Sequence, residues 1–130
     1  MRKSGGFTLI ELVLTLTIIG VLTAIIAPNF NSLRIRAKET NVKSTASAIQ
    51  IALESYYLNN NRYPTGTNIE SLITELNTDG VWSGNAINPF TQNAYTNSDT
   101  SGKITYSVNN DIYQLRAYAH DGTTVLIAYP

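Results

Sequence analysis

One carboxylate in this sequence stands where a charged group is costly. Glu11 lies inside a long apolar run, and from Leu12 to Phe30 there is no charged side chain. An ionisable group in such a run needs a partner, which makes it a candidate functional residue by default. We therefore expect Glu11 to pair with a cation, because an unpaired charge in an apolar environment is strongly destabilising. The alternative is that Glu11 lies close enough to the helix end to reach the headgroup layer.

The rest of the chain offers little for catalysis. Its 130 residues contain one histidine, His120, and no cysteine. The sequence has no glycine-rich phosphate loop and no His/Glu pair at metal-binding spacing. His120 precedes Asp121-Gly122, a pair typical of turns. We therefore predict that the protein is not an enzyme.

The apolar run, residues 7–30, is long enough to cross a membrane. As an α-helix it would extend about 36 Å, and a bilayer core needs about 20 mostly apolar residues. A cleaved secretory signal fits poorly, because the small pair Gly5-Gly6 precedes the run instead of following it. Basic residues flank both ends, so charge alone does not decide the orientation.

Two helix breakers, Gly20 and Pro28, interrupt the apolar run. Proline removes a backbone donor and clashes with the preceding turn. We expect Pro28 either to kink the helix or to let the segment from Gly20 to Pro28 unwind; the sequence leaves both open.

Residues 31–60 continue the helix with an amphipathic pattern. Apolar residues recur every seven positions and predict one stripe on a helix that ends near Leu58. The stripe consists of Ile35, Val42, Ala46, Ile49, Leu53 and Tyr56. We interpret it as the face on which a small domain packs. A self-standing coiled coil is the alternative, although Glu39 interrupts the stripe and the repeats are few.

Residues 61–130 predict a small globular domain with a connecting loop. Asn68 is placed to cap a short helix that contains Ile69, Leu72, Ile73 and Leu76. A loop rich in Gly, Asn, Ser and Thr follows, with a short strand expected near Tyr95. Three strand signals then occupy residues 104–108, 111–118 and 123–129, joined by Asn109-Asn110 and Asp121-Gly122 as turns. The fold class is therefore α+β, with a three-stranded antiparallel sheet packed on the long helix.

The residues from Gly6 to Leu12, GFTLIEL, follow a short basic leader and resemble the processing motif of type IV pilins and type II secretion pseudopilins. The resemblance implies that a prepilin peptidase removes residues 1–6 by cutting between Gly6 and Phe7, and then N-methylates Phe7. It also implies that Glu11, with Thr8, sets the register of each subunit by pairing with a neighbour's new amine. The segment from Gly20 to Pro28 would melt on assembly.

The resemblance continues into the domain. The order of a long helix, a connecting loop and an antiparallel sheet is similar to the type IV pilin fold. Residues 61–65 are similar to a motif that follows the helix in major pseudopilins, and residues 88–95 resemble their DPWGNPY loop. Here Asn88 stands where an Asp is usual, and Phe90 replaces Trp.

That loop binds calcium in the major pseudopilins, so a metal site has to be considered. Calcium takes six to eight oxygen ligands, several of them carboxylates. Asp99, Asp111 and Asp121 are the candidates, but no compact D-x-D-x-D-G pattern is present. We expect no cofactor, with calcium as the alternative.

The sequence therefore predicts a pilin-like subunit that polymerises through its N-terminal helix into an extracellular or periplasm-spanning filament. Alternatives are the major pseudopilin of a type II secretion system, a competence pseudopilin, or a single-pass protein that presents a binding or adhesive domain. The implied partners are other copies of the subunit, the prepilin peptidase, an inner-membrane assembly platform with its ATPase, and lipid before assembly. The precursor would lie in the inner membrane with a cytoplasmic N-terminus. A nucleic-acid partner is not expected, because removal of Arg2 and Lys3 leaves a slightly acidic chain.

Overall fold

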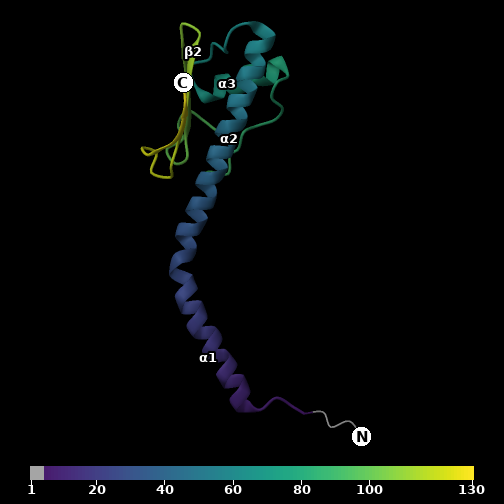
Figure 1. Ribbon diagram of the computed structural model, residues 1–130, viewed down its shortest axis with the longest axis vertical. Helices are drawn as coiled ribbons and strands as arrows, with labels where there is room; N and C mark the ends of the chain where they lie inside the picture. Colours follow the sequence, from purple (N-terminus) through teal and green to yellow (C-terminus); the bar gives the residue numbers. More distant parts are fainter. Residues whose placement is uncertain (1–4) are drawn as a thin grey trace. The chain divides into compact units, whose positions relative to one another are not determined.

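The computed structural model describes residues 5–130, which fall into two compact units (Figure 1). The first unit ends at Arg34, and the second comprises Ile35–Pro130. Arg2 and Lys3, which belong to the expected leader, lie outside the described residues.

The first unit is helical from residue 9 onward. Helix α1 spans Leu9–Ile26, the 3₁₀-helix η1 spans Ala27–Asn29, and α2 begins at Phe30. The α-helix runs through Gly20 without interruption, and its hydrogen-bond pattern changes only around Pro28. Pro28 has no N–H for the i−4 carbonyl, and the Phe30 N–H bonds to the carbonyl three residues back, at Ala27.

Helix α2, Phe30–Asn60, supplies one face of the core of the second unit. The buried residues on it are Val42, Ala46, Ile49, Ala52, Leu53 and Tyr56. Every member of the predicted stripe except Ile35, which is half-buried at the edge of the unit, is in this set. The predicted packing face is therefore confirmed.

Helix α3, Ile69–Asp79, begins at the predicted cap. The Asn68 side chain accepts a hydrogen bond from the Ser71 N–H at 2.9 Å. Ile69, Leu72, Ile73 and Leu76 are all buried, as their spacing predicts.

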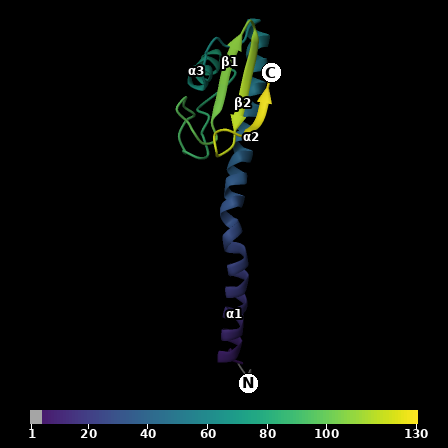
Figure 2. The ribbon, with the colours of Figure 1, turned by 90° about the vertical axis from the view of Figure 1, so that its left-hand side faces the viewer.

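The sheet is antiparallel with strand order β1-β2-β3, which confirms the α+β prediction (Figure 2). The strands are β1 Ile104–Asn109, β2 Ile112–Tyr118 and β3 Val125–Tyr129. Alternate residues of β1 and β2 are buried against the same core as α2, among them Tyr106 and Leu115. Near Tyr95 the expected short strand is only an isolated bridge between Ile87 and Ala94.

The first hairpin turn lies one residue later than predicted. Asn109 pairs with Ile112, so Asn110 and Asp111 are the central residues, with φ angles of 50° and 60°. Positive φ at both central positions is the type I′ geometry that matches strand twist. The prediction of Asn109-Asn110 was therefore wrong by one position.

Tyrosines join α2 to the segments that cover it. Tyr63 stacks on Tyr57 and also meets Tyr113, with ring centroids 4.8 and 4.7 Å apart. Tyr63 and Tyr113 both donate hydrogen bonds to the Glu54 carboxylate. Burial, together with the bond to Glu54, raises the pKa of Tyr113 to about 12. The buried Tyr106 hydroxyl donates to the Pro64 carbonyl at 2.8 Å, which fixes residues 61–65 against the sheet.

A substitution on α2 tests the packing face. Leu53 is fully buried in the core, whereas Ile51 on the same helix is 64% exposed. Leu53→Ala should lower the free energy of unfolding by about 2–5 kcal/mol, because it leaves a cavity. Ile51→Ala should change it by only about 0.5 kcal/mol or less, as expected for an exposed site. Denaturant titrations of the second unit's circular dichroism signal in detergent would measure both; equal effects would contradict the assigned face.

Candidate functional site

The expected cleavage bond lies in an exposed, non-helical segment. Gly5, Gly6 and Phe7 precede α1 without regular secondary structure, and Phe7 is 81% exposed. A Cβ atom placed on Gly5 or Gly6 would meet no heavy atom within 4 Å. The peptide bond between Gly6 and Phe7 is therefore accessible to a peptidase that binds non-helical backbone.

Thr8 and Glu11 form a reciprocal cap at the start of α1. Glu11 Oε2 accepts hydrogen bonds from the Thr8 N–H at 2.9 Å and from the Thr8 hydroxyl at 2.7 Å. The Glu11 N–H in turn donates to Thr8 Oγ1 at 3.3 Å. This capping box satisfies backbone donors that the first turn of a helix otherwise leaves unpaired. Among residues 5–130, Glu11 Oε1 accepts no hydrogen bond and so remains available to an outside donor.

The other polar side chains of α1 are satisfied within the helix. The hydroxyls of Thr15, Thr17 and Thr23 donate to carbonyls three or four residues back at 2.7–2.8 Å. None of the residues of α1 is buried, and its leucines and isoleucines are exposed on every side. By length and composition, the described part of the chain holds one helix able to cross a membrane, and it begins at Leu9. These internal bonds, which the residue pattern alone does not predict, leave no threonine hydroxyl of α1 without a partner in an apolar environment.

The loop between α3 and β1 is organised by a buried amide. Asn88 is fully buried, and its Nδ2 donates to Asp99 Oδ2 and to the Ser101 carbonyl, both at 3.0 Å. Its Oδ1 accepts from the Phe90 N–H at 2.9 Å. The Asn88 side-chain amide therefore donates to two oxygen atoms of the loop, one on Asp99 and one on Ser101. Because its own oxygen also accepts a bond, every polar group of the Asn88 side chain has a partner.

The three aspartates considered for calcium lie in different places. Asp99 belongs to the Asn88 loop, Asp111 to the β1–β2 turn, and Asp121 to the turn before β3. Across residues 5–130, no three His, Cys, Asp or Glu side chains gather in a group able to hold a metal ion. The structure does not bring the proposed ligands together.

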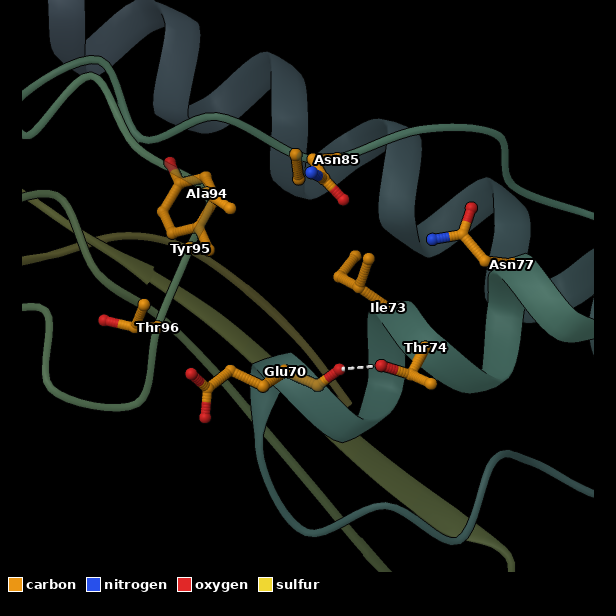
Figure 3. Close-up of a pocket in the computed structure, with 9 residues that line it drawn as sticks. Glu70, Ile73, Thr74, Asn77, Asn85, Ala94, Tyr95 and Thr96 are labelled. Carbon is orange, nitrogen blue, oxygen red and sulfur yellow. Dashed lines mark hydrogen bonds between the residues drawn. The ribbon is translucent and has the colours of Figure 1, made fainter.

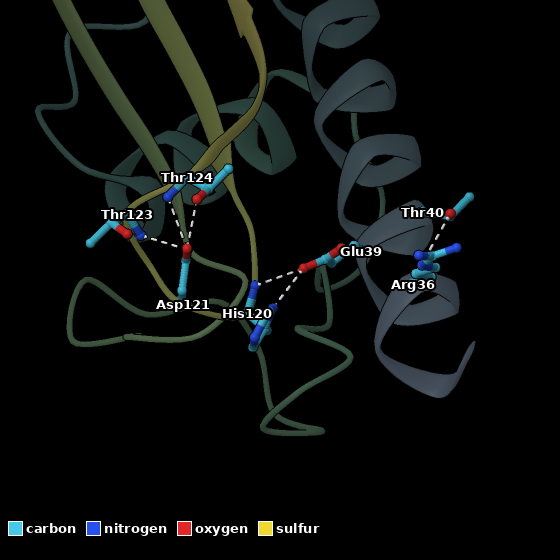
Figure 4. A network of polar contacts seen from close by, with 7 residues as sticks. All are labelled: Arg36, Glu39, Thr40, His120, Asp121, Thr123 and Thr124. Carbon is cyan, nitrogen blue, oxygen red and sulfur yellow. Dashed lines mark hydrogen bonds and ion pairs between the residues drawn. The ribbon is translucent and has the colours of Figure 1, made fainter. Parts of the chain in front are cut away.

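The turn before β3 is fastened to α2 through Glu39 (Figure 4). Glu39 Oε1 lies 2.9 Å from His120 Nδ1 and accepts the His120 N–H at 3.1 Å. These bonds lower the pKa of the Glu39 carboxyl below its ordinary value. In the sequence, the only signal of this contact is that Glu39 interrupts the apolar stripe; its partner is 81 residues away.

Asp121 organises the same turn from within. Its carboxylate accepts bonds from the Thr124 hydroxyl at 2.6 Å and from the N–H groups of Thr123 and Thr124 at 2.9 Å (Figure 4). These hydrogen bonds hold the pKa of Asp121 far below its ordinary value. Gly122 follows with φ 70°, and a Cβ there would collide with the Thr100 carbonyl oxygen. Asp121 is therefore a turn residue.

A cavity of about 220 Å³ lies between α3 and the Asn88 loop (Figure 3). Its lining includes one carboxylate, Glu70, with no histidine, lysine or cysteine. The buried Tyr95 hydroxyl has no hydrogen-bond partner among the described residues, and burial raises its pKa. The Thr74 hydroxyl donates to the backbone carbonyl of Glu70 and not to its carboxylate, so no hydroxyl of the described lining is hydrogen-bonded to the one carboxylate there, as an activated nucleophile would be.

The depressed pKa of Asp121 predicts an acid-sensitive turn. The ionised form is favoured in the folded state, so its contribution is complete above the ordinary aspartate pKa of about 4 and is lost as pH falls below it. Asp121→Asn should lower the melting temperature at pH 7, and the gap to wild type should narrow toward pH 3. Asp111→Asn is the control, because Asp111 is an exposed turn residue with φ 60°. A difference in melting temperature between wild type and Asp121→Asn that does not change with pH would show that the Asp121 charge does not stabilise the turn.

The first residues of the chain match a family model. Residues 1–27 match the prokaryotic N-terminal methylation motif. This range contains the exposed Gly6–Phe7 bond and the capping residue Glu11.

Named relatives match a longer region. A type II secretion system core protein G from Aeromonas hydrophila is 38% identical over 64 residues, which is 49% of this chain and 45% of that protein. The core protein G of Pseudomonas aeruginosa is 40% identical over 73 residues, 55% of this chain and 51% of that protein. The type IV major pilin protein PilA of Myxococcus xanthus is 39% identical over 61 residues, 47% of this chain and 28% of that protein.

The chain thus spans about half the length of the core protein G relatives that it matches. No solved structure matches it. The methylation motif and these relatives confirm the resemblance to type IV pilins and type II secretion pseudopilins.

Proposed function

We propose that the chain is the structural subunit of a pilin-like filament, which polymerises through helix α1. The observation that carries the proposal is an apolar helix with no buried residue. This helix is preceded by a solvent-exposed Gly6–Phe7 peptide bond and capped by one carboxylate. The named relatives and the methylation motif support the same class.

In this proposal, the apolar surface of α1 is covered by lipid before assembly and by neighbouring subunits in the filament. The large side chains of α1 are about half exposed or more, and burying each stabilises by roughly 1.5–3 kcal/mol. Lipid provides this burial to a single subunit before assembly. The apolar helices of neighbouring subunits provide it within a filament, where side-chain packing replaces lipid contact.

Glu11 is suited to set the position of a subunit. Cleavage would turn the Phe7 nitrogen into an ammonium group, and Glu11 Oε1 is available to accept from the Phe7 ammonium of a neighbour. In an apolar surrounding, a subunit shifted along the axis leaves both charges unpaired. One axial position is therefore favoured over the others. The helix segment from Gly20 to Pro28 would supply the local adjustment, with Pro28 already in 3₁₀ geometry.

Within this class, we favour the major pseudopilin of a type II secretion system. The relatives named core protein G are matched over 49–58% of the chain, against 47% for PilA. In this role the partners are other copies, a prepilin peptidase, and an inner-membrane platform with its ATPase. The precursor N-terminus would be cytoplasmic and the second unit would lie on the opposite side.

Processing gives the first prediction of this proposal. Mass spectrometry of protein from a host with the peptidase should show a mature chain that begins at N-methylated Phe7. A host without the peptidase should yield the chain with its leader. A retained Met1 in the first host, or cleavage beyond α1, would contradict a processed filament subunit.

Substitutions at Glu11 separate its charge from its cap. Glu11→Gln keeps an oxygen that accepts from the Thr8 N–H but removes the charge, and Glu11→Ala removes both. Both variants should insert into the membrane and lose assembly by roughly a hundredfold or more, because breaking a buried pair costs about 3–5 kcal/mol. Filament yield sheared from cells measures assembly, and carbonate-resistant membrane protein measures insertion.

The control for this series is Glu70→Gln. Glu70 is an exposed carboxylate in the first turn of α3, so it matches Glu11 in chemistry and helix position. The Glu70→Gln variant should assemble into filaments as wild type does. Normal assembly of Glu11→Gln with loss only in Glu11→Ala would assign Glu11 to the cap and remove its role in register.

A further inference from the structure

The start of α2 carries a concentration of positive charge. Within the ten residues that follow Leu33 there are four cations and one carboxylate. The cations are Arg34, Arg36, Lys38 and Lys43, and the carboxylate is Glu39. Arg34, Arg36 and Lys43 are exposed, and Lys38 is half-buried.

These four cations have no acidic partner in the described chain. Its pairs of basic and acidic side chains, Arg62 with Glu75 and His120 with Glu39, involve none of them. Glu39 points to His120 and accepts two of its hydrogen bonds (Figure 4). The one nearby carboxylate is therefore already engaged, and the basic segment keeps its charge.

The cations are spread around the helix instead of lying on one side. At about 100° per residue, Arg34 and Lys38 share one side of α2, and Arg36 and Lys43 share the opposite side. Aromatic rings support the first pair: the Arg34 guanidinium lies 5.9 Å from the Phe30 ring centroid, and Lys38 Nζ lies 5.3 Å from that of Phe90. A protein partner would contact one side of this arrangement, whereas a headgroup layer can reach the exposed Arg34 on one side and the exposed Arg36 and Lys43 on the other. Lys38, which lies over the Phe90 ring, is only partly accessible.

We propose that the exposed cations of this basic segment bind the anionic headgroups of phospholipids while the subunit is in the membrane. The inference rests on the proposed membrane residence of α1 before assembly. Arg34 directly follows Leu33, the last exposed apolar residue before the cations. From Arg34 to Lys43 the helix rises about 14 Å. This distance is well within the Debye length of about 30 Å at 0.01 M salt and exceeds the roughly 8 Å at physiological ionic strength, so the more distant cation contributes mainly at low salt.

Acidic groups of a second copy are a weaker fit. The carboxylates of α3 are Glu70, Glu75 and Asp79. Glu75 already accepts from Tyr56 and Thr65, and Asp79 accepts from Asn59 and Asn60. Among the described residues, only Glu70 and the exposed Asp111 of the β1–β2 turn are left without a bond to their side-chain carboxylates, too little charge for four cations.

Spin-labelled lipids give a direct test. The full chain is reconstituted in phosphatidylcholine vesicles that contain a trace of spin-labelled phosphatidylglycerol or spin-labelled phosphatidylcholine. Electron paramagnetic resonance then reports the motionally restricted fraction of each lipid at the protein. A cation near an anionic surface changes binding by about fivefold, so we expect phosphatidylglycerol to be preferred by about threefold or more at low salt and less at high salt.

Variants assign the preference to the segment. Arg36→Gln with Lys43→Gln should reduce it, and neutralising all four cations should remove most of it. Lys103→Gln with Arg116→Gln removes the same two charge types from the sheet region and should leave it unchanged. Arg2 and Lys3 are present in every sample, so they cancel in the comparison.

The outcomes separate this inference from the proposed function. No restricted component for either lipid would mean that α1 does not span the bilayer, and both proposals would fail. A restricted component without a preference for phosphatidylglycerol, or one unchanged by neutralising the four cations, would overturn the headgroup site alone. A cross-link in vesicles between cysteines placed at Ala37 and at Thr74 of another copy, together with an absent lipid preference, would assign the segment to a subunit contact.

Discussion

The exposed apolar surface of α1 is the constraint on which the rest of the molecule depends. Transfer of apolar surface out of water stabilises by roughly 25 cal/mol per Å², and no residue of α1 is buried by the described chain. Something outside the chain has to cover this helix. The internal bonds of Thr15, Thr17 and Thr23, and the reciprocal cap of Thr8 and Glu11, leave few polar groups to oppose that cover. The polar side chains of α1 thus already have partners within the helix, as an apolar environment requires.

The second unit has a small core that no disulfide stabilises. The sequence has no cysteine, and a domain of this size buries a limited share of its surface. Helix α2 contributes a continuous buried stripe, and long-range polar contacts fix the segments that lie on it. Tyr106 holds residues 61–65, Asn88 holds its loop, and Glu39 holds the turn before β3. These bonds connect residues that are 13 to 81 positions apart in the chain.

The sequence predicts what depends on local periodicity and much less of what depends on distant partners. The stripe of α2, the Asn68 cap and the three strands follow from spacing, and the structure has them. The first hairpin was misplaced by one residue, because Asn109, Asn110 and Asp111 all suit a turn and only the strand register selects among them. The partners of Glu39 and Asn88 could not be inferred, since neither contact has a periodic signal. The order of the GFTLIEL residues indicated the class of protein where geometry alone would not.

The cap of Glu11 also bears on how a subunit could change partners. In the single chain, Oε2 is engaged by Thr8 while Oε1 is unengaged by the described residues. A single chain in a bilayer would therefore keep the carboxylate partly satisfied, which would lower the cost of an ionisable group beside lipid. Loss of a helix cap costs about 1 kcal/mol, whereas an unmatched charge in an apolar surrounding costs several. A neighbour's ammonium at Oε1 could thus be gained without giving up the cap, and even full exchange of Thr8 for the ammonium would favour the pair. In the proposed filament, the same carboxylate would keep its helix cap through one oxygen atom and accept the neighbour's ammonium through the other.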